Sequence, residues 1–257
     1  MRNKVITATI LASCALFAAP ALAEMPAPQP AKTPPDAPKG WIVLDEDFWI
    51  PLIREPGMYF HRAHREFLEK DYGLSGTDLR QASAHVRLQA RRSTFKEHAA
   101  ALYTAANRLD NLAEQIEQKK IKNVSQLDRE FARTHYALAE NDAAMARESW
   151  KKDRAFQTGH HLNAAVLNLE SGFSWARQDM GKAGFAATAE ASQLADELIS
   201  GSSKSYEVNA TLDSVSNAVH SLSETVEKLP YDSNLDATSP TVATVPDFLP
   251  GWTLVEE

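Results

Sequence analysis

Cysteine is almost absent: the 257 residues contain one, Cys14. It lies in the apolar run before Ala23, where we expect cleavage, so the mature chain is expected to have none. A chain without cysteine has no disulfide framework, no thiol nucleophile, no thiolate metal site and no attachment point for a c-type haem. We therefore expect core packing alone to hold the fold, which a chain of this length permits.

Proline is absent from Gly57 to Leu229, a run of 173 residues, although six prolines lie in residues 24–40. A proline inside a helix costs about 3 kcal/mol. The run therefore predicts an all-α fold, a helical bundle of about five to seven helices over residues 57–229, with short extended segments at both ends. We expect a Pro-rich tether at 24–40, an extended aromatic docking segment at 41–56, and a C-terminal tail at 230–257 that docks on the bundle.

Several catalytic motifs are also missing. No histidine has a glutamate three residues before it, as the Glu-x-x-His pairs of di-iron bundles require. The chain has no His-Glu-x-x-His zinc motif, no glycine-rich phosphate loop and no Gly-x-Ser-x-Gly nucleophile elbow. We therefore expect no catalytic residue and a function other than catalysis.

Positive charge is in deficit. The formal net charge is −7, and loss of Arg2 and Lys4 with a cleaved leader would make it −9, which is −7 minus two positive charges. A negative protein is repelled by nucleic acid and by anionic lipid. We therefore expect neither as a partner.

The N-terminus predicts export. Residues 1–23 have a short basic start, an apolar run and a small-residue cleavage site, which is the pattern of a signal peptide cleaved after Ala23. We expect a periplasmic or secreted protein with no transmembrane segment, because no later run approaches the roughly 20 apolar residues of a spanning helix. The alternative is a lipoprotein, in which Leu11-Ala12-Ser13-Cys14 is a lipobox and Cys14 carries the lipid.

Apolar residues recur at helical spacing through the proline-free run. Thr94 with Glu97, and Ser125 with Asp128, have the spacing of N-terminal capping boxes. The predicted helices are Met58–Asp71, Thr77–Arg92, Phe95–Ile116, the central pair Leu127–Trp150 and Gly159–Met180, then Phe185–Ile199 and Val208–Leu229.

Two sets of residues recur along the chain, which predicts a duplicated helical hairpin in a four-helix core with an approximate two-fold axis. Chance matching of common residues is the alternative. One set is Asp78, Ala82, His85 and Leu88, which recurs as Asp128, Ala132, His135 and Leu138; the other is Leu102, Ala105 and Leu109, which recurs as Leu162, Ala165 and Leu169.

The repeat places His85 and His135 at equivalent positions, and Asp142 lies on the same stripe as His135. If the two rings faced each other, they could share a metal ion or form a haem-type ligand pair. The alternative, which we favour, is a pair of core histidines that fix helix register, since a buried imidazole needs a partner for each nitrogen.

A second candidate metal site is Met58, His61 and His64, spaced three residues apart on one helix. One thioether and two imidazoles make a soft clamp for copper, or a two-nitrogen start for zinc. Arg62 and Arg65 lie beside it and oppose a cation. We favour a solvated helix face.

A set of residues in the central part of the chain forms a recognisable pattern: Phe131-Ala132, His135 to Ala139, Trp150, Leu162, Ala164-Ala165, Leu169-Glu170 and Trp175-Ala176. It resembles a pattern found in exported, all-helical bacterial proteins of unknown function. In build, the chain is similar to the YfdX type of helical periplasmic protein, and the resemblance, which covers Met58 to Ser200, implies a stress-related role. No site residue follows from it.

The sequence therefore predicts an exported helical bundle that works by binding envelope proteins or a small ligand. The alternative is a carrier whose bundle histidines hold a metal ion or haem. A regular apolar stripe at Val208–Leu229 also leaves a homo-oligomer open, although such a stripe more often closes its own domain.

Overall fold

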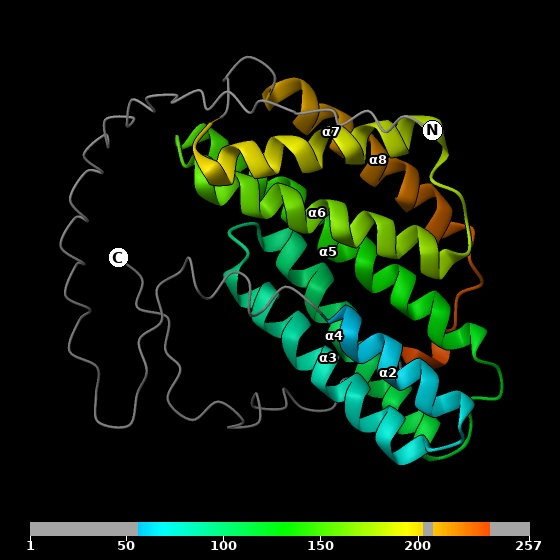
Figure 1. Cartoon of the computed structure of the whole chain (residues 1–257). Helices are drawn as coiled ribbons and strands as arrows, with labels where there is room; N and C mark the ends of the chain where they lie inside the picture. Colours follow the sequence, from blue (N-terminus) through cyan, green and yellow to red (C-terminus); the bar gives the residue numbers. More distant parts are fainter. Residues whose placement is uncertain (1–55, 203–207, 237–257) are drawn as a thin grey trace, which may run out of the picture.

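The computed structural model describes residues 56–202 and 208–236, and this part of the chain is all-α (Figure 1). The predicted signal peptide and tether, and most of the docking segment and tail, lie outside these residues. Within the described ranges, no helix combines the length and the apolarity that crossing a membrane would need. The elements are α2 (Gly57–Leu68), α3 (Tyr72–Arg92), α4 (Lys96–Glu117), α5 (Ser125–Lys151), α6 (Ala155–Ala176), α7 (Gly181–Ser200), α8 (Val208–Glu227) and the 3-10 turn η1 (Ser233–Leu235).

Helix α5 is shared by two hydrophobic cores. Phe131 and Leu138 pack with α2, α3 and α4, whereas Ala132, Ala139 and Ala146 pack with α6, α7 and α8. Figure 1 shows these two groups of helices on opposite sides of α5. The all-α bundle is confirmed, but the expected single four-helix core is wrong, because α5 carries one stripe of large residues and a second stripe of alanines.

Several helix boundaries differ from the sequence prediction, and three of them have a clear local cause. Helix α3 begins at Tyr72 because the Asp71 side chain accepts a hydrogen bond from the Leu74 amide at 3.2 Å. Helix α2 ends at Leu68, and Lys70 then takes a left-handed φ of 66°. Helix α6 ends at Ala176 because Arg177 takes a φ of 54°, so the predicted continuation to Met180 is wrong.

Both predicted capping boxes are wrong. Phe95 precedes α4 without a side-chain cap, and the Thr94 hydroxyl lies 3.4 Å from the Met145 sulfur. Val124 precedes α5, and Asp128 accepts a hydrogen bond from Arg177 at 2.6 Å. In each case a polar side chain that the local pattern predicted to cap a helix contacts a residue distant in the chain instead.

After α8 the chain returns to the other core. Leu235 is buried among the residues of α2, α3 and α4. The buried Arg108 holds this segment: its guanidinium contacts Glu130 at 2.8 Å, the Tyr231 hydroxyl at 3.0 Å and the Asp236 carboxylate. Residues 229–236 therefore link the two cores a second time, in addition to α5.

Candidate functional site

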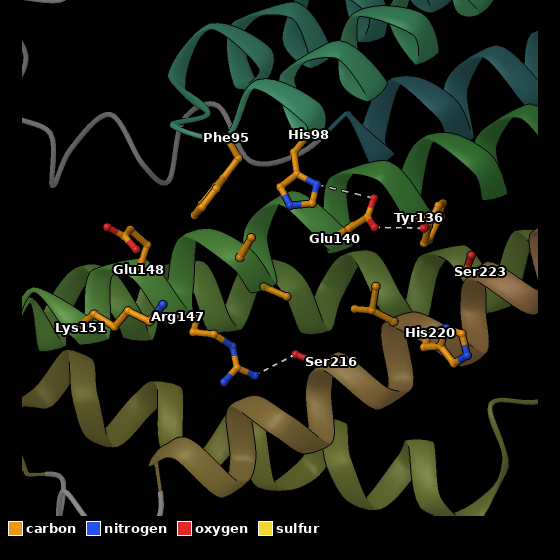
Figure 2. Close-up of a pocket in the computed structure, with 13 residues that line it drawn as sticks. Phe95, His98, Tyr136, Glu140, Arg147, Glu148, Lys151, Ser216, His220 and Ser223 are labelled. Carbon is orange, nitrogen blue, oxygen red and sulfur yellow. Dashed lines mark hydrogen bonds and ion pairs between the residues drawn. The ribbon is translucent and has the colours of Figure 1, made fainter.

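A groove of about 350 Å³ lies where the start of α4, the second half of α5 and the second half of α8 meet (Figure 2). Its volume is within the range of small-ligand sites, about 300–1,000 Å³. Four apolar residues line it: Phe95 before α4, Ala143 and Ala144 on α5, and Val219 on α8. Because two of them are alanines, a ligand can approach the α5 backbone closely.

Glu140 joins the polar side chains at one end of the groove. The Tyr136 hydroxyl donates to Glu140 Oε1 at 3.1 Å, and His98 Nδ1 lies 3.7 Å from Oε2 (Figure 2). Burial raises the pKa of Tyr136. The phenol therefore stays protonated at neutral pH and acts as a hydrogen-bond donor.

Arg147 occupies the other end. Its guanidinium donates to Asp213 Oδ1 at 2.8 Å and to Ser216 Oγ at 3.1 Å, both on α8. Lys151 and Glu148 line the groove beyond it. The groove thus offers apolar surface between charges of both signs, which suits binding by apolar contact, hydrogen bonds and ion pairs.

Sequence reasoning missed this groove because its residues come from three helices that lie far apart in the chain. One signal was present on α5, where Tyr136, Glu140, Arg147 and Lys151 recur at helical spacing and form a polar stripe. A stripe of that kind is most often a solvated helix face, and nothing in the sequence indicates that α8 and the start of α4 border it.

A second polar cluster is buried between α5 and α6. His135 Nδ1 lies 2.9 Å from Asn168 Oδ1, Asn168 Nδ2 donates to Asp142 Oδ2 at 3.1 Å, and His161 Nδ1 lies 3.7 Å from Asp142 Oδ1. Seven residues separate His135 from Asp142 on α5, and seven separate His161 from Asn168 on α6. In an antiparallel helix pair, this equal spacing puts the two pairs in register. The structure therefore brings the predicted His135 and Asp142 into one network through Asn168, with His161 beside Asp142, and sequence reasoning selected neither Asn168 nor His161.

The network fixes the tautomer of His135. The Asn168 amide nitrogen donates to Asp142 and, at 3.0 Å, to the Ala164 carbonyl, so the amide oxygen accepts from His135 Nδ1. His135 Nε2 then carries a lone pair, and it has no hydrogen-bond partner among the described residues. Burial lowers the pKa of His135 to about 4, so the ring is neutral at pH 7.

His85 lies outside this network. Its ring contacts Tyr59 with a centroid separation of 5.3 Å, whereas the His135 ring meets the adjacent residue Phe60 edge-on at 5.2 Å. The two repeated histidines thus each contact a ring of α2. Among the described residues, no group of three or more His, Cys, Asp or Glu side chains is arranged to hold a metal ion. Methionine sulfur lies outside that set.

The other predicted metal residues lie on α2 beside Trp175. The rings of His61 and His64 lie 4.9 and 5.3 Å from the Trp175 ring, and Met58 is 52% exposed. His64 Nε2 lies 3.2 Å from Asp128 Oδ1. Sequence reasoning missed Trp175 and Asp128 here, because neither residue is near α2 in the chain.

Comparisons with models of protein families, with curated proteins and with solved structures gave no match for this chain. The case for its function therefore rests on its own residues and their geometry.

Proposed function

We propose that this protein acts by noncovalent binding in the bacterial envelope and not by catalysis, and that the groove between α4, α5 and α8 holds a helical segment of a partner protein. One observation carries the proposal: the apolar residues Phe95, Ala143, Ala144 and Val219 line a groove whose polar groups include both signs of charge. Interfaces of this kind combine an apolar centre with a polar rim.

The shape of the groove favours a helix as its occupant. α5 is bordered by α4 on one side and α8 on the other, so a further helix laid along α5 would pack between them. An amphipathic helix binds such a groove through apolar residues at helical spacing. Glu140 and Glu148 would pair with basic residues of the partner, and Arg147 and Lys151 with acidic ones.

Panning of a phage-displayed random peptide library against the full mature protein tests this proposal. Ala144→Arg fills the groove with a long side chain on a half-buried position, and Ala186→Arg on the exposed face of α7 is the matched control. We expect selected peptides to carry apolar residues at helical spacing, and to bind the Ala186→Arg protein but not the Ala144→Arg protein. Peptides that bind both proteins equally would refute the groove as the site.

Location and role are part of the same proposal. Residues 1–23 support export with cleavage after Ala23, and the resemblance to YfdX-type proteins supports a role in envelope stress. Cell fractionation with N-terminal sequencing checks the location, and we expect a periplasmic chain that begins at Glu24. A lipid-labelled chain that begins at Cys14 would establish the lipoprotein alternative.

A second candidate is a carrier that holds a metal ion or haem on its core histidines. The observation that favours it is the lone pair of His135 Nε2, which is buried and without a hydrogen-bond partner in the described part of the chain. Metal analysis and an absorption spectrum of untagged protein test it. Near-stoichiometric metal or a haem band that is lost in His85→Ala or His135→Ala would put this function first.

A further inference from the structure

One face of α2 carries a thioether and two imidazoles beside the ring of Trp175. Met58, His61 and His64 follow one another at three-residue steps, so neighbouring side chains are adjacent on the helix. Both histidine rings contact Trp175, whose own ring meets Phe131 at 4.9 Å. The core thus fixes the tryptophan, while Met58 and His61 are exposed and free to turn toward a ligand.

His64 has a carboxylate beside one of its ring nitrogens, as metal-bound histidines often have. Its Nε2 lies 3.2 Å from Asp128 Oδ1, a close polar contact outside hydrogen-bond geometry, and a carboxylate at this distance favours a proton on the nearer nitrogen. The lone pair is then on Nδ1. Asp128 is in turn held by Arg177, whose Nη2 lies 2.6 Å from Oδ2. A carboxylate on the far nitrogen is the common outer contact of a histidine ligand.

Two arginines near this face, Arg62 and Arg177, are paired with aspartates, whereas Arg65 on the same helix still opposes a cation. Arg62 Nη2 lies 2.9 Å from Asp78 Oδ1, and Arg177 is paired with Asp128. Both aspartates are buried at 3% exposure, so each partly cancels the positive charge of its arginine. What repulsion remains acts twice as strongly on a divalent ion as on a monovalent one.

We propose that this face binds a soft monovalent metal ion, Cu(I), through the Met58 sulfur, a nitrogen of His61 and His64 Nδ1, with the Trp175 ring covering the ion. Thioether and imidazole are ligands that Cu(I) accepts, and a tryptophan face attracts a cation more strongly than the other aromatic rings do. Asp128 acts as a positioning residue, because it orients His64 without touching the metal. This site is separate from the groove, so either proposal can fail without the other.

Titration of the full mature protein with Ag(I), a redox-stable stand-in for Cu(I), tests the site. We expect one ion per chain by native mass spectrometry, and quenching of tryptophan fluorescence that disappears in Trp175→Phe. Met58→Leu and His61→Ala should each weaken binding by at least about tenfold, and Asp128→Asn by about tenfold. His220→Ala, at an exposed position on α8, is the matched control and should leave the affinity unchanged.

Competition with a chromophoric Cu(I) chelator under reducing, anaerobic conditions then gives the affinity for copper itself. Met58 and His61 are exposed, so their variants are expected to melt like the unaltered protein, which separates lost binding from lost folding. The proposal is overturned if Ag(I) binds the Met58→Leu, His61→Ala double variant as tightly as the unaltered protein. It is also overturned if Zn(II) binds this face as tightly as Ag(I).

Discussion

His135 Nδ1 and Asn168 Oδ1 lie 2.9 Å apart at the centre of the α5–α6 contact. The same amide holds Asp142, so one asparagine serves two buried titratable side chains. Replacing Asn168 with alanine would leave a buried imidazole N–H and a buried carboxylate without this partner.

We expect Asn168→Ala to lower the free energy of unfolding by about 2–4 kcal/mol, because unsatisfied buried polar groups keep their full desolvation cost. Urea unfolding measures the change. Asn163→Ala, at a half-buried position of the same helix, is the control and should cost at most about 0.5 kcal/mol. Equal losses in the two variants would mean that the network contributes nothing beyond its packing.

The buried His135 also predicts that the folded protein loses stability at acidic pH. Burial lowers the pKa of His135 to about 4, compared with 6.5 for an unperturbed histidine. Between these pH values the unfolded chain binds a proton that the folded chain does not, so the free energy of unfolding falls as pH falls from about 6.5 to 4. From about pH 7 to pH 5 we expect His135 to account for a loss of about 2 kcal/mol.

His135→Gln isolates this contribution from other groups that titrate nearby. Burial also lowers the pKa of His85, which acts in the same direction, whereas burial and the charge of Asp78 raise the pKa of Glu66, which acts in the opposite direction. Urea unfolding of both proteins at the two pH values gives the difference. If the pH dependence is the same with and without the imidazole, His135 is not its source.

The ion-pair cluster around Arg108 is expected to contribute strongly to the free energy of unfolding. Burial by itself would lower the pKa of Arg108, but the hydrogen bond to the buried Glu130 and the charges of Glu130 and Asp236 together raise it, so the guanidinium stays charged. Arg108→Met leaves Glu130 with a weaker partner set and frees Asp236. We expect a loss of about 3 kcal/mol in unfolding free energy and faster hydrogen exchange at the Leu235 amide.

Arg147→Met is the matched control for Arg108→Met. The Arg147 ion pair with Asp213 is largely exposed, and exposed pairs contribute between about 0 and 1 kcal/mol. The control should therefore be nearly neutral in urea unfolding. If both variants lose a comparable free energy of unfolding, burial does not make the Arg108 cluster more stabilising than an exposed ion pair.

Two glycines predict opposite effects of the same substitution. A Cβ at Gly159 would lie 2.8 Å from the Ala195 carbonyl oxygen, so Gly159→Ala must push α6 and α7 apart and should cost about 1–3 kcal/mol. At Gly73 in α3 the nearest atom would be Asp71 Oδ1 at 3.9 Å, which is ordinary contact. Gly73→Ala should therefore stabilise the protein by up to about 1 kcal/mol through helix propensity. Thermal and urea unfolding of the two variants check the signs, and a stabilised Gly159→Ala would contradict the close packing.

The sequence predicted the helices well because the proline-free run and the apolar spacing are local signals. Helix ends were predicted less well. Asp128 lies three residues after Ser125 and so resembles a cap, yet its partner Arg177 is 49 residues away, and no local rule can rank that contact. The two-core arrangement could not be predicted either, because an alanine on α5 does not indicate which helices pack against it.

For the candidate sites, the titratable residues could be selected from sequence but their partners could not. His135 and Asp142 were conspicuous because they interrupt an apolar stripe. Asn168 has no such feature in the sequence, and only the structure shows that it contacts both residues. His61 and His64 were visible as a spacing, but Trp175 and Asp128 come from other helices. The groove needs three helices at once, which explains why no motif indicates it.

The return of residues 229–236 to the first core has a consequence for the order of synthesis. Leu235 belongs to the core of α2, α3 and α4, although it follows α8 in the chain. A ribosome that has made those three helices and α5 has therefore made a core that still lacks one of its side chains. Residues that follow α8 complete the core of the first helices. This core can therefore reach its native packing only after nearly the whole described chain has been synthesised.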